Sequence, residues 1–330
     1  MIGICQFGAG RIGQIHAANV AAHAEAELRY IVDVSADAAN TIAGRHGAKI
    51  ADARQALNDE AIDAVIVASS TDTHADIVKA AARAGKAIFC EKPIDLELAP
   101  VDDCLAEVEA AGVMMQIGFN RRFDPSFAAL HGQLRDGRIG AVELVAITSR
   151  DPAPPPIEYI RVSGGLFRDM MIHDFDMARW LMNEDPVEVF AAASCLVDDA
   201  IGAAGDVDTA AVVLSFASGA LCQISNSRRA VYGYDQRIEV FGAKGMLRAH
   251  NRTPTSVELS TEDGIVADKP LHFFLERYAE SYKAELDHFI DCVKGEATPL
   301  TGPADGRMAL VLAEAARTSL ANGGPVPVRP

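Results

Sequence analysis

A histidine flanked by two acids is one of the chemical signals in this sequence. Asp169, His173 and Asp176 follow a pair of glycines in a segment whose pattern predicts one helix continuing to Trp180. Spacings of four and three residues place the three side chains on one face of such a helix. An imidazole there can accept the proton of a substrate hydroxyl, with Asp169 orienting it. The alternatives are an Asp–His pair on the solvent-exposed surface of a helix and a metal site. The spacing of these residues is not typical of the ligands of any particular metal.

A lysine at the start of a loop is the second candidate. Lys92 stands in Glu91-Lys92-Pro93, at the C-terminal end of a strand predicted over 87–93. In an open parallel sheet, ligands bind at this edge. A lysine there can hydrogen-bond a substrate hydroxyl and stabilise the alkoxide that develops on it. An ordinary surface lysine at a loop start is the alternative.

A glycine-rich turn between the first predicted strand and the first predicted helix matches the pattern GxGxxG. Its residues are Gly8, Ala9, Gly10, Arg11, Ile12 and Gly13. Such a turn lets the N–H groups of a helix N-terminus approach a pyrophosphate, although a plain glycine turn would look the same. Asp33, at the end of the second predicted strand, supplies a carboxylate for the ribose hydroxyls of NAD and repels the 2′-phosphate of NADP. Together, the glycine-rich turn and Asp33 predict NAD as the cofactor.

The elements that must position these residues follow from the spacing of apolar residues. Short strands are predicted at 2–7, 28–34, 64–69, 87–93 and 113–119, and helices at 12–24, 36–46, 74–84 and 96–111. Strands that are apolar on both faces, each followed by a helix, indicate a parallel sheet covered on both sides. We therefore predict an α/β fold whose residues 1–120 form a doubly wound, NAD-binding Rossmann domain.

A second domain is predicted over residues 121–330. Alternating runs separated by glycine turns lie at 141–149, 208–219, 220–229 and 237–247. They predict an α+β domain with an antiparallel sheet. One amphipathic helix is predicted at 273–295, with its apolar stripe as a packing face rather than a binding surface. A last helix at 303–320 can pack back on the N-terminal domain.

The charge and the cysteine content of the sequence limit the functions that the protein can have. Lys and Arg total 30 and Asp and Glu total 46 among 330 residues, a net charge of −16. This opposes nucleic acid or an anionic membrane as a partner, because both bind basic surfaces. No signal-like segment begins the sequence, and no apolar run is long enough to span a bilayer. Six scattered cysteines without a CxxC pair are expected as reduced thiols, so we expect a cytoplasmic protein.

Three segments together resemble a known family. They are the GAGRIG turn, the EKP tripeptide and the stretch from the glycine pair at 164–165 to Leu181. In these segments, and over nearly the whole chain, the sequence resembles the Gfo/Idh/MocA oxidoreductases. The resemblance implies that Lys92, Asp169 and His173 are catalytic and that the peptide bond into Pro93 is cis. It also implies that the C-terminal domain binds the substrate and has an open, mainly antiparallel sheet that joins copies into dimers or tetramers.

The resemblance is strongest to family members that oxidise inositols, through residues 118–124 and 232–235. The resemblance implies that the cofactor is bound by the glycine turn, by Asp33 and by five further residues, Ser69, Ser70, His74, Glu91 and Lys92. Around a cyclic polyol such as myo-inositol it places Lys92, Asn120, Arg121, Asp151, Asp169, His173, Asp176 and Tyr234. Asn120 stands where the family has an apolar residue.

The implied reaction is NAD-dependent oxidation of a ring hydroxyl to a ketone, giving 2-keto-myo-inositol from myo-inositol. A dehydrogenase of the scyllo-inositol or glucose type is the alternative within the family. A non-catalytic regulator that senses a dinucleotide tends to lose the lysine or the histidine, and a structural oligomer leaves Asp33 unexplained. We therefore expect an enzyme with NAD as cofactor, a small cyclic polyol as partner, no metal, and assembly into a homo-oligomer.

Overall fold

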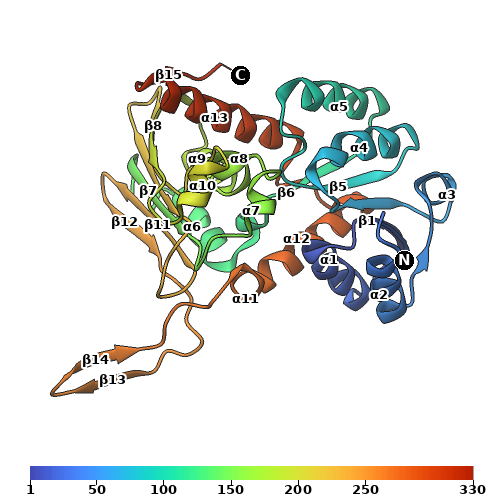
Figure 1. Ribbon diagram of the computed structural model, residues 1–330, viewed down its shortest axis with the longest axis horizontal. Helices are drawn as coiled ribbons and strands as arrows, with labels where there is room; N and C mark the ends of the chain where they lie inside the picture. Colours follow the sequence, from blue (N-terminus) through green and yellow to red (C-terminus); the bar gives the residue numbers. More distant parts are fainter. Residues whose placement is uncertain (330) are drawn as a thin grey trace. The chain divides into compact units, whose positions relative to one another are not determined.

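The structure is a computed structural model that describes residues 1–329, and the chain forms two compact units (Figure 1). Unit 1 combines Met1–Phe123 with Ser281–Leu310, and unit 2 combines Asp124–Glu280 with the residues from Val311 onward. The border that we predicted near residue 120 lies beside the first crossing between the units. The chain crosses twice more, at 280/281 and inside the last helix at 310/311.

Unit 1 is built on a six-stranded parallel sheet in the order β3-β2-β1-β4-β5-β6. The strands are β1 (Ile2–Phe7), β2 (Ala26–Val32), β3 (Lys49–Ile50), β4 (Ala64–Val67), β5 (Ala87–Glu91) and β6 (Met115–Gly118). The central strands are buried along nearly their whole length, as parallel strands covered by helices must be. The strand order reverses between β1 and β4, where such sheets bind ligands. The predicted Rossmann fold is confirmed.

The helices of unit 1 include one contributed by the returning chain. They are α1 (Arg11–Ala22), α2 (Ala36–His46), α3 (Ala53–Asn58), η1 (Thr71–Thr73), α4 (His74–Arg83), α5 (Leu98–Ala111), η2 (Asn120–Phe123) and most of α12 (Ala279–Lys294). Leu286, Phe289 and Ile290 of α12 are at most 2% exposed and share one hydrophobic cluster with β1, β2 and β4. Helix α12 therefore completes the core of unit 1.

Unit 2 is built on a seven-stranded sheet in the order β12-β11-β7-β10-β9-β8-β15. The strands are β7 (Val142–Arg150), β8 (Pro186–Ser194), β9 (Thr209–Phe216), β10 (Leu221–Ser227), β11 (Asp235–Gly242), β12 (Gly245–Ala249) and β15 (Val326–Pro327). Only β7 and β10 pair in parallel. Buried and exposed residues alternate along the strands, so one face packs on the core and the other is open. The predicted open, mainly antiparallel sheet is confirmed.

Helices and a separate hairpin complete unit 2. The helices are α6 (Pro125–Arg135), α7 (Ile157–Ile160), α8 (Gly165–Asp169), α9 (Ile172–Met182), α10 (Asp199–Ala203), α11 (Phe274–Arg277) and the later part of α13 (Pro303–Asn322). The hairpin β13 (Glu258–Thr261) and β14 (Gly264–Ala267), which we did not predict, extends away from the rest of unit 2 (Figure 1). A helix apolar and long enough to cross a bilayer does not occur in residues 1–329.

The single helix predicted over 273–295 is wrong. Tyr278 lies between α11 and α12 with φ −112° and ψ 15°, which interrupts the helix. Its hydroxyl donates to Oε1 of Gln236 at 3.2 Å, and the preceding Arg277 pairs with Asp124. Two buried tertiary contacts on adjacent residues thus override the helical preference of the segment.

Candidate active site

Glycines shape the turn after β1. Gly8 has a φ of +100°, which residues with a side chain rarely adopt. A Cβ at Gly13 would lie 2.3 Å from the carbonyl oxygen of Gly8, and Nε2 of Gln6 donates to the carbonyl oxygens of both glycines at 2.8 Å. A Cβ at Gly10 would meet no atom within 4 Å. The turn is therefore tight on its inner side and open on its outer side, where the N-terminus of α1 begins.

Asp33 lies directly after β2, beside the glycine turn. Its Oδ2 accepts a hydrogen bond from the N–H of Ala9 at 2.6 Å, and its Oδ1 accepts one from the N–H of Ser35 at 2.7 Å. Each carboxylate oxygen keeps a further acceptor site. The side chain is thus fixed in place and can still accept hydrogen bonds from the hydroxyls of a ribose. The neighbouring Val34 is fully exposed, which leaves an apolar surface next to the acid.

His74 joins the loops that follow β4 and β5. Its Nδ1 lies 2.9 Å from the carbonyl oxygen of Pro93, and its Nε2 lies 3.1 Å from that of Ser69. The Lys92–Pro93 peptide bond is cis, which confirms the expectation. His74, which we predicted beside the cofactor, is 2% exposed and contacts both loops. Ser69 is half-buried and Ser70 is exposed.

Glu91 forms a buried pair with His16 of α1. Nε2 of His16 lies 2.7 Å from Oε1 of Glu91, and the two side chains are 1% and 11% exposed. The imidazole packs edge-on against Phe89. A Cβ at Gly118 would come within 2.8 Å of Oε2 of Glu91, so a side chain there would displace the Glu91 carboxylate. Glu91 is therefore fixed at the end of β5, from which Lys92 emerges.

Asn120 and Arg121 lie in η2, directly after β6, and are 2% and 5% exposed. Nδ2 of Asn120 is buried and has no hydrogen-bond partner among residues 1–329. An unpaired buried amide donor costs on the order of 1–3 kcal/mol. Such a donor is suited to an oxygen of a bound molecule, which supports the predicted role of Asn120 as a substrate contact.

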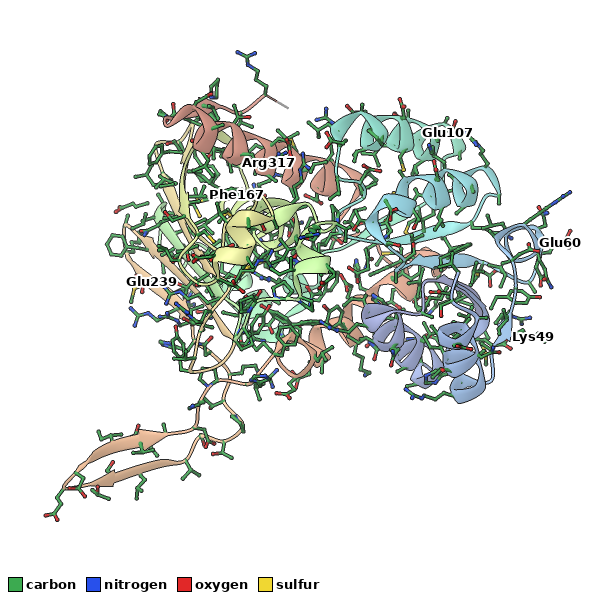
Figure 2. The ribbon with its side chains drawn as sticks, in the orientation of Figure 1. Lys49, Glu60, Glu107, Phe167, Glu239 and Arg317 are labelled. Carbon is green, nitrogen blue, oxygen red and sulfur yellow. The ribbon has the colours of Figure 1, made fainter. Side chains whose placement is uncertain are left out.

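The segment that carries Asp169 and His173 is not the single helix that we predicted. Helix α8, marked by Phe167 in Figure 2, ends at Asp169, and α9 begins three residues later. The N–H of Met171 bonds to the carbonyl oxygen of Leu166, five residues back, which is a widened turn of the π type. This turn shifts the helical phase. The four-residue spacing of Asp169 and His173 therefore does not place them on one continuous helical face.

Arg228 is a buried cation that the sequence analysis missed. It follows β10 directly and is 2% exposed. Oδ2 of Asp169 lies 3.5 Å from both Nη atoms, Oδ2 of Asp151 lies 3.8 Å from Nη1, and Oδ2 of Asp206 lies 3.9 Å from Nη2. The parallel pairing of β7 and β10 brings Asp151 and Arg228 to the same sheet edge. That register is not visible in the sequence, so no local signal points to Arg228.

Two other predicted substrate contacts lie largely inside unit 2. Asp176 on α9 is 1% exposed, and Tyr234, just before β11, is 7% exposed. The ring of Tyr234 packs edge-on against Tyr278 and Phe273, with ring centroids 5.9 and 6.0 Å away. Unit 2 thus holds the predicted acids and the histidine, whereas unit 1 holds the glycine turn, Asp33 and Lys92.

The cysteines are not disulfide-bonded in residues 1–329. All six are free thiols, and five of them are buried. Burial raises the pKa of the Cys5 thiol to about 12 and raises that of Cys90 well above its usual value. Because the thiolate is the reactive form, these two thiols are excluded as nucleophiles near neutral pH.

Both parts of the chain match models of one protein family. Residues 2–119 match the oxidoreductase family's NAD-binding Rossmann fold, and residues 131–328 match its C-terminal alpha/beta domain, both named Gfo/Idh/MocA. The chain belongs to the Gfo/Idh/MocA oxidoreductase family. As a member it is an NAD-dependent oxidoreductase, and the tight inner side of the glycine turn, its open outer side and the fixed Asp33 all fit NAD.

Several Gfo/Idh/MocA proteins that are similar to this chain in sequence or structure are named inositol dehydrogenases. The chain is 52% identical to the inositol 2-dehydrogenase of Rhizobium meliloti (strain 1021), over 95% of both chains. It is 53% identical to the myo-inositol 2-dehydrogenase of Thermotoga maritima, over 95% of this chain and 94% of that one. The crystal structure of scyllo-inositol dehydrogenase from Lactobacillus casei with bound NAD(H) and scyllo-inositol superposes with a TM-score of 0.92 at 28% identity, covering 99% of each chain.

Proposed function

We propose that this protein is a myo-inositol 2-dehydrogenase, which oxidises one ring hydroxyl of myo-inositol to give 2-keto-myo-inositol with NAD as the oxidant. The observation that carries the proposal is the identity of 52–53% to two inositol 2-dehydrogenases over nearly the whole chain. The chain also has every residue of the predicted catalytic set, Lys92, Asp169 and His173.

The proposed mechanism divides the oxidation between a proton and a hydride. NAD, when bound, supplies the hydride acceptor at C4 of its nicotinamide. His173 takes the proton of the hydroxyl that becomes the ketone, Lys92 donates a hydrogen bond to the same oxygen, and Asp169 supports the imidazole. We also propose Asn120, Arg121, Asp151, Asp176 and Tyr234 as partners of the other ring hydroxyls. A site that pairs each hydroxyl rejects analogues that lack one.

NAD contacts are proposed from the glycine turn and from the loops beside it. Residues of the turn, including the first helical residues Arg11 and Ile12, offer N–H groups to the diphosphate. Ser69 and Ser70 follow β4, at the sheet edge where such domains bind the dinucleotide. Glu91, which pairs with His16 of α1, and His74, which bonds to the loops after β4 and β5, are also proposed beside the cofactor.

Asp33→Ala is expected to lower the preference for NAD over NADP, measured as the ratio of kcat/KM values, by about 10- to 100-fold. The substitution removes an acceptor for the ribose hydroxyls and the charge that repels a 2′-phosphate. Asp37→Ala is the matched control, because Asp37 is an exposed acid in the first turn of α2. An unchanged ratio in Asp33→Ala, or an equal fall in Asp37→Ala, would contradict this role.

We also propose that copies of the chain assemble through the open face of the seven-stranded sheet, as a dimer or tetramer. Met246, Phe241, Leu144 and Leu221 occupy paired positions on four adjacent strands. They are between 39% and 47% exposed, and such a row of apolar side chains is typical of a protein interface. The free cysteines support a reducing compartment, and we propose the cytoplasm.

A panel of polyols tests the proposed function. Purified protein is mixed with NAD and with myo-inositol, scyllo-inositol or glucose, and the appearance of NADH is followed by its absorbance. We expect the highest kcat/KM with myo-inositol. A higher kcat/KM with scyllo-inositol or glucose would identify that compound, and not myo-inositol, as the preferred substrate. If no polyol gives NADH, the proposed function is rejected.

A further inference from the structure

A buried guanidinium lies beneath three carboxylates in unit 2. The side chain of Arg228 is 2% exposed, whereas those of Asp151, Asp169 and Asp206 are 17%, 14% and 12% exposed. Each acid therefore keeps an exposed edge while the cation is covered. Burying a guanidinium without a partner is costly, and three acids without a counter-charge repel one another. The guanidinium and the three carboxylates therefore stabilise one another.

The same group holds α8 at both of its ends. Oδ1 of Asp206 accepts a hydrogen bond from the N–H of Leu166 at 3.0 Å, in the first turn of the helix. A Cβ at Gly165, whose φ is +82°, would come within 2.6 Å of that oxygen, so the glycine makes room for Asp206. Arg228 reaches the start of α8 through Asp206 and its end through Asp169.

The carboxylate of Asp169 has partners on both oxygens. Its Oδ1 accepts a hydrogen bond from the hydroxyl of Tyr159 at 2.9 Å, and its Oδ2 faces Arg228 at 3.5 Å. The distances from Arg228 to the three acids exceed those of ordinary hydrogen bonds. The guanidinium therefore acts as a charge shared among the acids. A planar cation can face several acids at once, and the compact ammonium of a lysine cannot do so equally well.

We propose that Arg228 is a positioning residue for the dehydrogenase reaction. It holds the carboxylate of Asp169, and that of Asp151 beside it, in the orientation that His173 and the hydroxyls of a polyol require. The inference rests on the proposed function, because it assigns Arg228 a part in the reaction through Asp169. Arg228 itself touches neither substrate nor cofactor in this scheme.

The first test compares variants of two adjacent arginines. Arg228→Met is expected to lower kcat for myo-inositol about 100-fold, the effect of a displacement of about 1 Å in a catalytic group. Arg228→Lys keeps the charge and is expected to lose only about tenfold. The Kd for NAD, from fluorescence titration, stays at the wild-type value in both. The control Arg229→Met changes an exposed arginine whose Nη2 lies 3.5 Å from the carbonyl oxygen of Leu196, and it is expected to keep the wild-type kcat.

A double-mutant cycle separates positioning from general support of the fold. If Arg228 acts through Asp169, Arg228→Met added to Asp169→Asn lowers kcat little further. A merely structural role predicts that the two losses multiply, and that result would overturn the proposal. So would a wild-type kcat in Arg228→Met. If the methionine variant does not fold, Arg228→Lys decides: a loss of kcat at an unchanged Kd supports the proposal, and a wild-type kcat rejects it.

Amide hydrogen exchange, measured on the protein without substrate, tests the positioning role of Arg228 independently of the proposed function. In Arg228→Lys, faster amide exchange confined to residues 164–173 is expected, with no change in Arg229→Met. If the wild type oxidises no polyol, the proposed function fails, and this local exchange still shows whether Arg228 positions α8 and Asp169. Unchanged exchange there rejects the positioning role, even when the wild type is fully active.

Discussion

His173→Ala is expected to lower kcat for myo-inositol by about 1,000-fold, which is the usual contribution of a positioned general base. The hydroxyl proton then loses its proposed acceptor as the hydride leaves. His173 lies on α9 in unit 2, whereas the glycine turn and Asp33 lie in unit 1. The Kd for NAD is therefore expected to stay at the wild-type value. Steady-state kinetics measure kcat, and a titration of the protein's intrinsic fluorescence with NAD measures the Kd.

His250→Ala is the matched control, because His250 is an exposed histidine of unit 2 just after β12. It is expected to keep the wild-type kcat. Added imidazole is expected to restore part of the activity of His173→Ala, since a free base can enter the space that the side chain leaves. Turnover near the wild-type rate in His173→Ala would remove His173 from the mechanism. A large loss in His250→Ala would show that kcat responds to surface histidines in general.

Asp124→Ala is expected to lower the free energy of unfolding by about 4 kcal/mol, because it leaves a buried cation without its partner. The Asp124 and Arg277 side chains are 0% and 1% exposed and form an ion pair. Burial alone would lower the pKa of Arg277, but the hydrogen bond to Asp124, together with Tyr278, raises it above its usual value. The guanidinium therefore stays charged, 4.8 Å from the ring centroid of Tyr278 and 5.3 Å from that of Phe127.

Asp198→Ala is the control for the helix-capping role of Asp124, which is separate from its ion pair. Oδ1 of Asp124 also caps α6 through the N–H groups of Ser126 and Phe127. Exposed Asp198 caps α10 without a buried cation, so its loss is expected to cost only about 1 kcal/mol. Adding Arg277→Met to Asp124→Ala should recover part of the loss, because the unpaired charge is then gone. Urea unfolding curves give these free energies, and equal losses in the two alanine variants would contradict the account.

The parts of the site that depend on spacing along the chain could be predicted from the sequence. The turn from Gly8 to Gly13, and Asp33 after the next strand, must keep a fixed order because one β–α–β unit holds them. Strands that are apolar on both faces likewise predicted the first sheet, and alternating apolar residues predicted the second. These features are local, so the sequence alone carries the information.

The remaining features depend on tertiary contacts. Arg228 meets Asp151 through the register of two strands that are far apart in the sequence. The interruptions of two predicted helices, at Tyr278 and near Met171, follow from buried hydrogen bonds and a widened turn, not from glycine or proline. Because such contacts bring together residues with no common spacing, periodicity could not reveal them.

The division of the chain into units has a consequence for its biosynthesis. Leu286, Phe289 and Ile290 complete the core around β1, β2 and β4, yet all of Asp124–Glu280 is translated before them. Domains usually fold in the order in which they leave the ribosome, N-terminus first. Here the nucleotide-binding half must wait for α12, so the half that is translated first is completed late. A nascent chain that stops before α12 therefore has no finished Rossmann core.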